Sequence, residues 1–265
     1  MLALDFTHFY DEAENKRRFA MKLTRIVAVL LLLPLSGWAG TFIETFNNDD
    51  WEEWQELVQQ NEKPGTWEII DRELHAVSAD GWPRLLTIGN KKWRDYTIEI
   101  DVKPIEKHRL ASILIAARIK DTWLVFCEIG DRLFGTPNVI CRTGDFHTNR
   151  SELLYFGNHP LLKLNDWSTL KLSVKGETFI FSVNDEKITE TGGDFAFVLA
   201  GRAIFEAKVG RLHGFLTGGA GFGLANYTAK FDNLIITGKD IPNKGTLPVV
   251  SRGKLATTWG HLKRF

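Results

Sequence analysis

Short segments in which apolar and polar residues alternate recur between residues 41 and 237, and turn residues separate them. Clear examples are TFIETF at 41–46, TWEIID at 66–71, ELHAVS at 73–78 and STLKLSVKG at 168–176. Alternation puts successive side chains on opposite faces of a strand, so each segment can bury one face. Many short strands separated by turns are typical of a β-sandwich. The sequence therefore predicts an all-β fold, with scarcely any helical signal.

The remaining predicted strands continue the series to Gly238. They are RLLTIG (84–89), DYTIEIDVKP (95–104), LASILIAARI (110–119), TWLVFCEIG (122–130), NVICRTG (138–144), SELLYFG (151–157), TFIFSVNDEKIT (178–189), GAGFGLANY (219–227) and AKFDNLIITG (229–238). Residues 47–63 read as a polar segment, and residues 195–205 allow one helical turn. After Gly238 the periodicity ends, which predicts a linker and a weakly docked or poorly ordered tail over 239–265.

Charge gives no indication of a nucleic-acid partner. Lys and Arg together number 33, as do Asp and Glu, so the formal net charge is zero. No basic stretch is interleaved with aromatic residues, which argues against nucleic acid and against an anionic membrane surface. The nine Trp and eighteen Phe serve either core packing or, where exposed, stacking on sugar rings.

The N-terminal region reads as a secretory signal peptide. Lys22 and Arg25 precede an apolar run over 26–35, and the small residues Gly37 and Ala39 fit a cleavage site after Ala39. The apolar run is too short to span a bilayer comfortably, and no later stretch is long enough either. The mature protein is therefore expected to be exported, to the periplasm or the extracellular space, without a stable membrane span.

Three regions follow from these patterns. Residues 1–39 form an N-terminal extension plus signal peptide, in which Met21 is the expected true start. Residues 40–238 form one β-sandwich domain, and residues 239–265 form the linker and tail.

Two cysteines flank the predicted turn GDRLFGTPN at 130–138. In a hairpin centred near Phe134, Cys127 and Cys141 lie opposite one another, which suits a disulfide in an exported protein. The alternative is a pair of buried thiols that pack as small apolar groups. In the same register Glu128 and Arg142 are diagonal neighbours on the other face, where they can form a cross-strand ion pair.

Four stretches resemble a known superfamily. They are FIETF with the later GTWEIIDRELHA, DYTIEIDVKP with KDTWLVFCEIG, NDWSTLKLSVKGETFIFSVNDEKI, and GGAGFGLANYTAKFDNLIITG. Together they resemble the concanavalin A-like lectin/glucanase superfamily, in particular its laminin-G-like and 3-keto-disaccharide hydrolase-like domains. The resemblance covers about residues 41–238 and implies an antiparallel two-sheet jelly roll. Such domains include lectins, carbohydrate-binding modules and glycosidases, so the fold alone does not decide the function.

The resemblance also raises the question of whether the chain carries a catalytic motif. Hydrolases of the laminarinase type on this fold carry E-x-D-x-x-E on one strand, and Glu99 and Asp101 match its first two places. The third place holds Pro104, and Glu106 follows beyond the strand end that this proline predicts. Because the third carboxylate is missing, we expect a polar sandwich face here rather than a two-carboxylate catalytic site.

The superfamily usually binds its ligand on the concave face, and several residues are candidates to line it. They are Arg118, Glu128 and Arg142, with Glu99 and Asp101, and with Trp82 or Trp123 as a stacking platform. The alternative is a solvated face held by surface ion pairs, which contribute little to stability. If the chain is an enzyme, Glu99, Asp101 and Glu128 are the candidate acid or base.

A calcium ion is the one cofactor that the resemblance suggests. Glu44 and Asp232 match the first and last strands, where jelly rolls of this kind often hold Ca²⁺, and carboxylate oxygens suit that ion. The alternative for Asp232 is a turn interaction with nearby backbone.

These observations lead to an exported, non-catalytic carbohydrate-binding module as the expected function, with the glycan on the concave sheet. The alternatives are a glycoside hydrolase or 3-keto-disaccharide hydrolase relative, and a laminin-G-like adhesion module with a protein partner.

Overall fold

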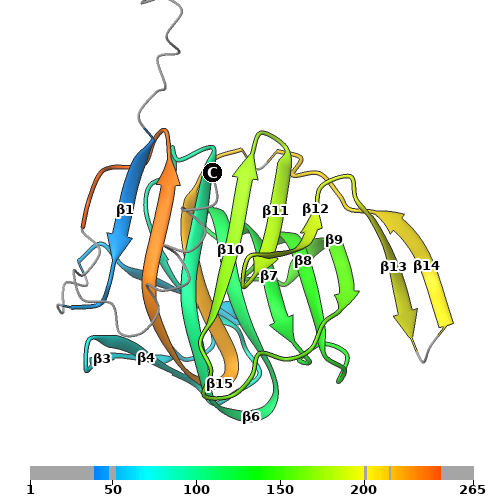
Figure 1. Cartoon of the computed structure of the whole chain (residues 1–265), viewed down its shortest axis with the longest axis horizontal. Coiled ribbons are helices and arrows are strands. Elements are labelled where there is room, and N and C mark those ends of the chain that lie inside the picture. Colours follow the sequence, from blue (N-terminus) through cyan, green and yellow to red (C-terminus); the bar gives the residue numbers. More distant parts are fainter. Residues whose placement is uncertain (1–38, 48–51, 200–201, 215, 246–265) are drawn as a thin grey trace, which may run out of the picture. The chain divides into compact units, whose positions relative to one another are not determined.

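The computed structural model describes residues 39–47, 52–199, 202–214 and 216–245. Apart from one 3-10 turn at Gln59–Asn61, its regular elements are all strands (Figure 1). In chain order they are β1 (Gly40–Glu44), β2 (Gln55–Val58), β3 (Thr66–Ile70), β4 (Glu73–Ser78), β5 (Arg84–Ile88), β6 (Tyr96–Lys120), β7 (Trp123–Gly130), β8 (Asn138–Asp145), β9 (Arg150–Asn158), β10 (Ser168–Lys175), β11 (Thr178–Val183), β12 (Glu186–Glu190), β13 (Asp194–Leu199), β14 (Arg202–Lys208) and β15 (Gly219–Gly238). The predicted all-β fold is confirmed.

Two long antiparallel strands, β6 with 25 residues and β15 with 20, organise the sandwich. The first part of β6, Tyr96–Val102, pairs with β10, whereas Ser112–Ala117 pairs with β7. Each long strand therefore belongs to two layers. The first layer runs β12-β11-β10-β6-β15, with β1 and the β4–β3 hairpin on the far side of β15. The second layer runs β9-β8-β7-β6-β15-β5-β2.

The core fills the space between the two layers. Ile98 and Ile100 of β6 face it from the first layer, and Val125 and Cys127 of β7 face it from the second. All four side chains are at most 1 % exposed. A sandwich of this kind leaves two outer faces, one per layer, and any side chain that alternates with the core residues lies on one of them.

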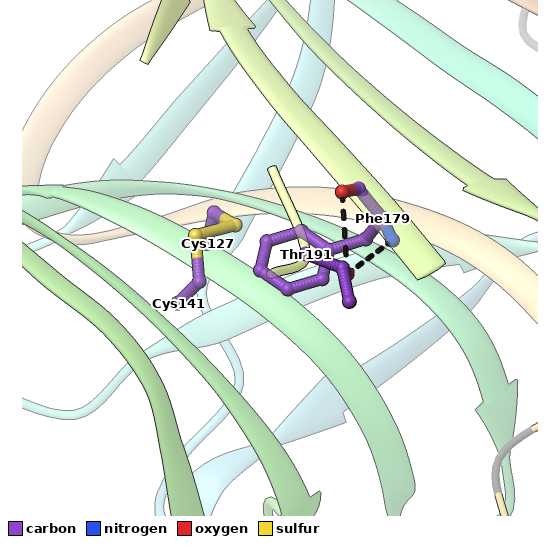
Figure 2. Close-up of a disulfide and its surroundings, with 4 residues drawn as sticks. All are labelled: Cys127, Cys141, Phe179 and Thr191. Carbon is purple, nitrogen blue, oxygen red and sulfur yellow. Dashed lines mark hydrogen bonds between the residues drawn. A yellow bond between two sulfur atoms is a disulfide. The ribbon is translucent and has the colours of Figure 1, made fainter. Parts of the chain in front are cut away.

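A disulfide joins Cys127 and Cys141 inside this core (Figure 2). The two residues are direct partners in the β7–β8 register, and both are fully buried. Phe179 of β11, from the opposite layer, belongs to the same core cluster. The hairpin turn predicted around Phe134 is therefore present, over residues 131–137.

Two predicted strand breaks are wrong. Pro104 does not end a strand, because β6 continues through it to Lys120. Pro104 lies beyond the last residue that β10 pairs and beside a bulge in the β6–β15 ladder, where a missing N–H costs little. The break predicted at Thr228 is also a bulge, within β15.

Two other segments differ from expectation. The described residues 195–199 and 202–205 hold no helical turn; they belong to β13 and β14, which form a two-stranded sheet of their own. The polar segment 47–63 contains the edge strand β2. The start of the predicted linker packs along β1, because Ile43 N–H donates to the Lys244 carbonyl at 2.8 Å and Ile241 is buried. Residues 246–265, like the signal peptide and the expected start at Met21, lie outside the described residues.

Glycines let β15 approach its neighbours closely in the second layer. A Cβ on Gly223 would meet the Arg84 carbonyl oxygen at 1.8 Å, and one on Gly219 would meet the Ile88 carbonyl oxygen at 2.6 Å. These glycines belong to the stretch TGGAGFG, and β15 there lies between β6 and β5 rather than at a sheet edge. No helix among the described residues is long and apolar enough to cross a membrane.

Removal of the disulfide is expected to destabilise the domain. The Cys127→Ala/Cys141→Ala variant should lose about 3 kcal/mol of unfolding free energy, because the bond closes a loop of sequence separation 14. Urea denaturation measures the loss, and the parent protein in reducing agent serves as the control. An unchanged urea midpoint in the variant would contradict the prediction.

Candidate functional site

The β7–β8 register places a carboxylate and a guanidinium together on the outer face of the second layer. Because Cys127 and Cys141 point into the core, Glu128 and Arg142 point outward as diagonal neighbours. Arg142 Nη2 donates to Glu128 Oε1 at 2.7 Å. The cross-strand ion pair predicted from the sequence is therefore present.

Both oxygens of Glu128 are occupied. Glu128 Oε2 accepts hydrogen bonds from Ser112 Oγ at 3.0 Å and from Arg132 Nη2 at 3.1 Å, and Oε1 accepts the bond from Arg142. The Glu128 side chain is only 2 % exposed. Its carboxylate thus fixes two guanidinium groups, Arg132 from the β7–β8 loop and Arg142 from β8.

These neighbours decide the charge of Glu128. Burial alone would raise its pKa, but the positive charges of Arg132 and Arg142 outweigh burial and lower the pKa below the ordinary glutamate value. Glu128 is therefore ionised at neutral pH. A general acid needs the opposite shift, so this carboxyl group is poorly suited to that role.

Arg142 is itself buried, and it joins the cluster to the exposed Asn149. Its guanidinium carbon lies 4.8 Å from the centroid of the Phe126 ring, and Nη1 donates to Asn149 Oδ1 at 3.3 Å. Gln59 Nε2 donates to the same Asn149 oxygen at 3.2 Å. Among the described residues, Arg142 Nε and Gln59 Oε1 are buried without a hydrogen-bond partner. A buried donor and acceptor of this kind suit a hydroxyl group or a water, which can both give and accept.

An exposed aromatic ring packs on the same outer face as the two arginines. Phe134, in the same loop as Arg132, is 50 % exposed and packs edge-on against Phe156 with ring centroids 5.1 Å apart. Phe156 pairs with Ile140, which alternates with the core-facing Cys141 and so shares the outer face with Arg142. The outer face of the second layer therefore combines an exposed apolar ring with two fixed guanidinium groups whose side chains are each 10 % exposed.

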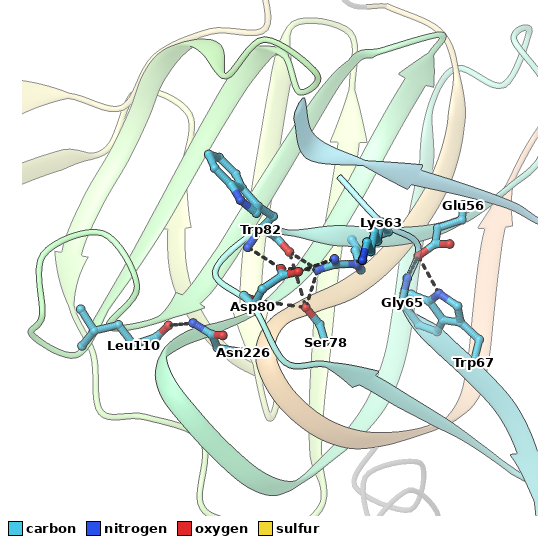
Figure 3. A network of polar contacts seen from close by, with 10 residues as sticks. Glu56, Lys63, Gly65, Trp67, Ser78, Asp80, Trp82, Leu110 and Asn226 are labelled. Carbon is cyan, nitrogen blue, oxygen red and sulfur yellow. Dashed lines mark hydrogen bonds and ion pairs between the residues drawn. The ribbon is translucent and has the colours of Figure 1, made fainter. Parts of the chain in front are cut away.

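Trp82 lies in the loop that adjoins this face. Gln59 N–H donates to the Pro83 carbonyl at 3.1 Å, so the loop meets the 3-10 turn of the cluster. Asp80 and Ser78 bind the guanidinium of the loop's neighbour Arg84. Figure 3 shows the Trp82 indole turned away from these hydrogen bonds. The tryptophan is half-buried and remains a candidate for contact with a ligand.

Glu99 and Asp101 lie on the opposite side of the molecule from Glu128. They alternate with the core residues of β6 in the first layer and face outward there. Glu99 pairs with Lys171 at 2.7 Å, and Asp101 accepts a hydrogen bond from Asn233 Nδ2 at 3.0 Å. The expectation that they line one face with Glu128 and Arg142 is therefore wrong.

The third place of the catalytic motif supplies no carboxylate. It holds the buried Pro104, while the Glu106 side chain is 69 % exposed and lies 3.6 Å from His108.

Arg118 and Trp123 do not join the cluster either. Arg118 is fully buried at a bulge of β6, and it donates to the Gly176 carbonyl of the β10–β11 turn at 2.5 Å. Its role is to tie the second layer to that turn. Trp123 is 47 % exposed, but by alternation it belongs with Val125 and Cys127 rather than with Glu128.

The two calcium candidates have local partners. Glu44 Oε1 accepts the N–H of Phe46 at 2.7 Å, and Asp232 Oδ1 accepts the N–H of Asn233 at 2.8 Å. The second contact is the turn interaction considered as an alternative. Within the described ranges, no group of three His, Cys, Asp or Glu side chains could hold a metal ion. Calcium binding stays a prediction.

The sequence missed Arg132, Phe134, Ser112, Asn149 and Gln59 as members of this site. Arg132 lies four residues after Glu128, a spacing that predicts contact only on a helix. Glu128 is in strand β7 and Arg132 is in the loop after it, so the spacing gave no signal. Asn149 and Gln59 are 90 residues apart and meet only because two loops close over the same layer. An exposed Phe in a turn rich in polar residues was the one available signal.

Loss of the Glu128 charge is expected to destabilise the fold strongly. In the Glu128→Gln variant, Arg132 and Arg142 lose their counter-charge in a buried setting, which costs about 3 kcal/mol or more. The matched control is Glu99→Gln, whose pair with Lys171 is about one-third exposed and should cost less than about 1 kcal/mol. Urea denaturation of both variants makes the comparison, and equal losses would contradict this account.

The difference between parent and Glu128→Gln should depend on pH in a defined direction. Glu128 has a lower pKa in the folded state than in the unfolded state, so its stabilising contribution is complete above the ordinary value of 4.5. It is lost as the pH falls through the lowered folded-state pKa. Unfolding measured from neutral pH downward should therefore show the difference in unfolding free energy between parent and variant shrinking as Glu128 becomes protonated. A difference that grows as the pH falls would refute the lowered pKa of Glu128.

Comparisons with known proteins agree with the fold. The carbohydrate binding module CBM66 from Bacillus subtilis superposes with a TM-score of 0.50 at 16 % identity, over 69 % of this chain and 93 % of that one. A Bacillus subtilis protein of unknown function with a galectin-like fold gives a TM-score of 0.52 at 15 % identity, over 74 % and 96 %. No curated protein matches the sequence. At these identities the likeness shows the jelly-roll fold alone.

The sequence itself assigns the family. The model of the galactocerebrosidase C-terminal lectin domain matches residues 37–239, which is most of the chain. The chain belongs to this lectin-domain family.

Proposed function

We propose that this protein is an exported, non-catalytic carbohydrate-binding module and that its glycan lies on the outer face of the second layer. The observation that carries the proposal is the exposed Phe134 ring on the same outer face as Arg132 and Arg142, two guanidiniums fixed by one buried carboxylate. Membership of a lectin-domain family supports the same class of ligand.

The chemistry of this face suits a sugar. A pyranose ring has an apolar face that stacks on Phe134. Its hydroxyl groups can accept hydrogen bonds from Arg132, and they can donate to or accept from the Asn149 amide. Trp82 supplies a second platform at the neighbouring loop. Because Glu128 holds both arginines in place, little side-chain freedom is lost when the glycan binds.

A binding role fits the carboxylates better than a catalytic role. Glu128 is ionised and fully engaged, so it lacks both the proton of a general acid and a free oxygen for nucleophilic attack. Glu99 and Asp101 are held by Lys171 and Asn233 on the other outer face, and the motif lacks its third carboxylate. Hydrolysis by a relative of the glycoside hydrolases or 3-keto-disaccharide hydrolases is the competing outcome.

Export is part of the proposal. It is supported by the signal-peptide pattern over residues 21–39 and by the buried disulfide, which is typical of oxidising compartments. Periplasmic and extracellular destinations are both consistent with these features.

A glycan array probed with the secreted chain tests the class of ligand, with and without Ca²⁺. The array should show binding to a defined group of glycans, and the bound glycan should be recovered intact after incubation. Cleavage of the glycan would establish the hydrolase alternative. A protein that binds no glycan would refute the proposal and favour the laminin-G-like adhesion role.

Phe134→Ala is expected to weaken binding of the best array ligand about tenfold, which is the loss of one stacking anchor. The matched control is Trp123→Ala, since Trp123 is similarly exposed but lies on a different surface. Titration calorimetry measures both affinities, and thermal melts verify that neither change unfolds the protein. Loss of affinity in Trp123→Ala with none in Phe134→Ala would move the site elsewhere.

A further inference from the structure

A cavity of about 350 Å³ lies at the edge of the first layer, away from the proposed glycan face. Its described walls come from β1 and the residues just after it, from Glu53 and Trp54 before β2, from Ile88 of β5, and from Lys244 and Gly245 after β15. We propose that this cavity is a second carbohydrate site and that it holds a single uncharged sugar ring. It extends carbohydrate binding to another part of the domain and does not depend on the outer-face site.

Aromatic side chains form the apolar part of the cavity. Phe42, which is only 2 % exposed, and the half-buried Trp54 both line the cavity. The Trp54 ring packs against Phe46 and Phe222, with centroid distances of 6.1 Å and 6.0 Å. A ring held in this way loses little freedom when it stacks on a ligand, which is how flat sugar faces are recognised.

Hydrogen-bond acceptors form the polar part. Glu44 Oε1 accepts the Phe46 N–H, and Asn47 Nδ2 donates to Thr45 Oγ1 at 2.5 Å. Within the described part of the chain, the other oxygen of Glu44 and the side-chain oxygen of Asn47 have no hydrogen-bond partner. Both residues line the cavity, so it offers two acceptors to an incoming donor. Sugar hydroxyl groups are donors of this kind.

An ion pair stands at the mouth of the cavity. Lys244 Nζ lies 2.7 Å from Glu53 Oε2, and their side chains are 46 % and 58 % exposed. The same ammonium lies 5.9 Å from the centroid of the Phe42 ring. The Lys244 backbone is fixed to β1, since its N–H donates to the Thr41 carbonyl at 3.1 Å. The mouth therefore joins two segments that are distant in the sequence.

Charge and size select the ligand. Glu44 and Glu53 carry two negative charges against the single positive charge of Lys244, so an acidic sugar meets net repulsion. The volume is near the lower end of the range of ligand pockets, which suits one ring rather than a chain. An uncharged hexose, free or at the end of a glycan, has the hydroxyl donors and the apolar face that this lining matches.

The test uses methyl galactoside, methyl glucoside, methyl mannoside and galacturonic acid as probes in ligand-observed NMR titrations of the full secreted chain. At least one uncharged glycoside should bind, and galacturonic acid should bind at least tenfold more weakly than that glycoside. Failure of all three glycosides to bind, or preferential binding of galacturonic acid, would overturn the proposal.

Variants then locate the binding. Glu44→Gln keeps an oxygen for the Phe46 N–H but replaces the open acceptor with a donor, and it should weaken glycoside binding about tenfold. Asn47→Ala, the second variant, should also weaken glycoside binding. It keeps the proposal testable if Glu44→Gln disturbs the fold. Glu99→Gln, the same chemical change at a carboxylate outside the cavity lining, should leave this affinity unchanged.

The two sites can fail separately. Glycoside binding that disappears in Phe134→Ala and persists in Glu44→Gln and Asn47→Ala would refute the cavity site and leave the outer-face site intact. The reverse result would establish the cavity site even if the array ligand were found elsewhere.

Discussion

The pairing of β6 with β15 is the constraint on which the rest of this structure depends. The two strands share both layers, so their register fixes which residues of every neighbouring strand point into the core. β7 pairs with β6 so that Cys127 lies opposite Ile115 and Glu128 opposite Leu114. Cys127 and Ile115 both face the core, so the next pair, Glu128 and Leu114, must point outward. Bulges near Pro104 and Thr228 let the strands bend between layers without losing this pairing.

A buried carboxylate on an outer face is costly unless its partners are also fixed. Glu128 gives up its hydration and recovers the loss from Arg132, Arg142 and Ser112, each within hydrogen-bond distance. The result is a rigid set of donors with an accessible ring beside it. This arrangement links stability to recognition, since the same contacts that hold the β7–β8 hairpin also orient the groups proposed to bind a glycan.

Local patterns in the sequence sufficed to predict the β7–β8 hairpin, but they did not predict on which outer face of the sandwich each polar side chain lies. Alternation and one turn predicted the Cys127–Cys141 register and the Glu128–Arg142 contact, because both depend on a single pair of adjacent strands. Alternation also predicted that Glu99 points to the face opposite the core residues of its own strand. It gave no information on which of the two outer faces that strand occupies, and the predicted grouping with Glu128 was wrong for that reason.

Local patterns could not predict the full length of the long strands or the contacts between loops, for a different reason. A proline and a Thr–Ala bulge look like strand ends unless the partner strands are known, so β6 and β15 were each divided in two. Residues 195–205 lack strong alternation, and the β13–β14 hairpin was not recognised. Asn149, Gln59 and the docking of Lys244 on β1 depend on long-range closure, which no local window contains.

Glycan binding on the outer face is tested most directly by a structure of the protein with its best array glycan bound. We expect the sugar ring to stack on Phe134, with hydroxyl groups bonded to Arg132 or Asn149 and with Glu128 still holding both arginines. A glycan seated beside Glu99 and Asp101 on the first layer would contradict it.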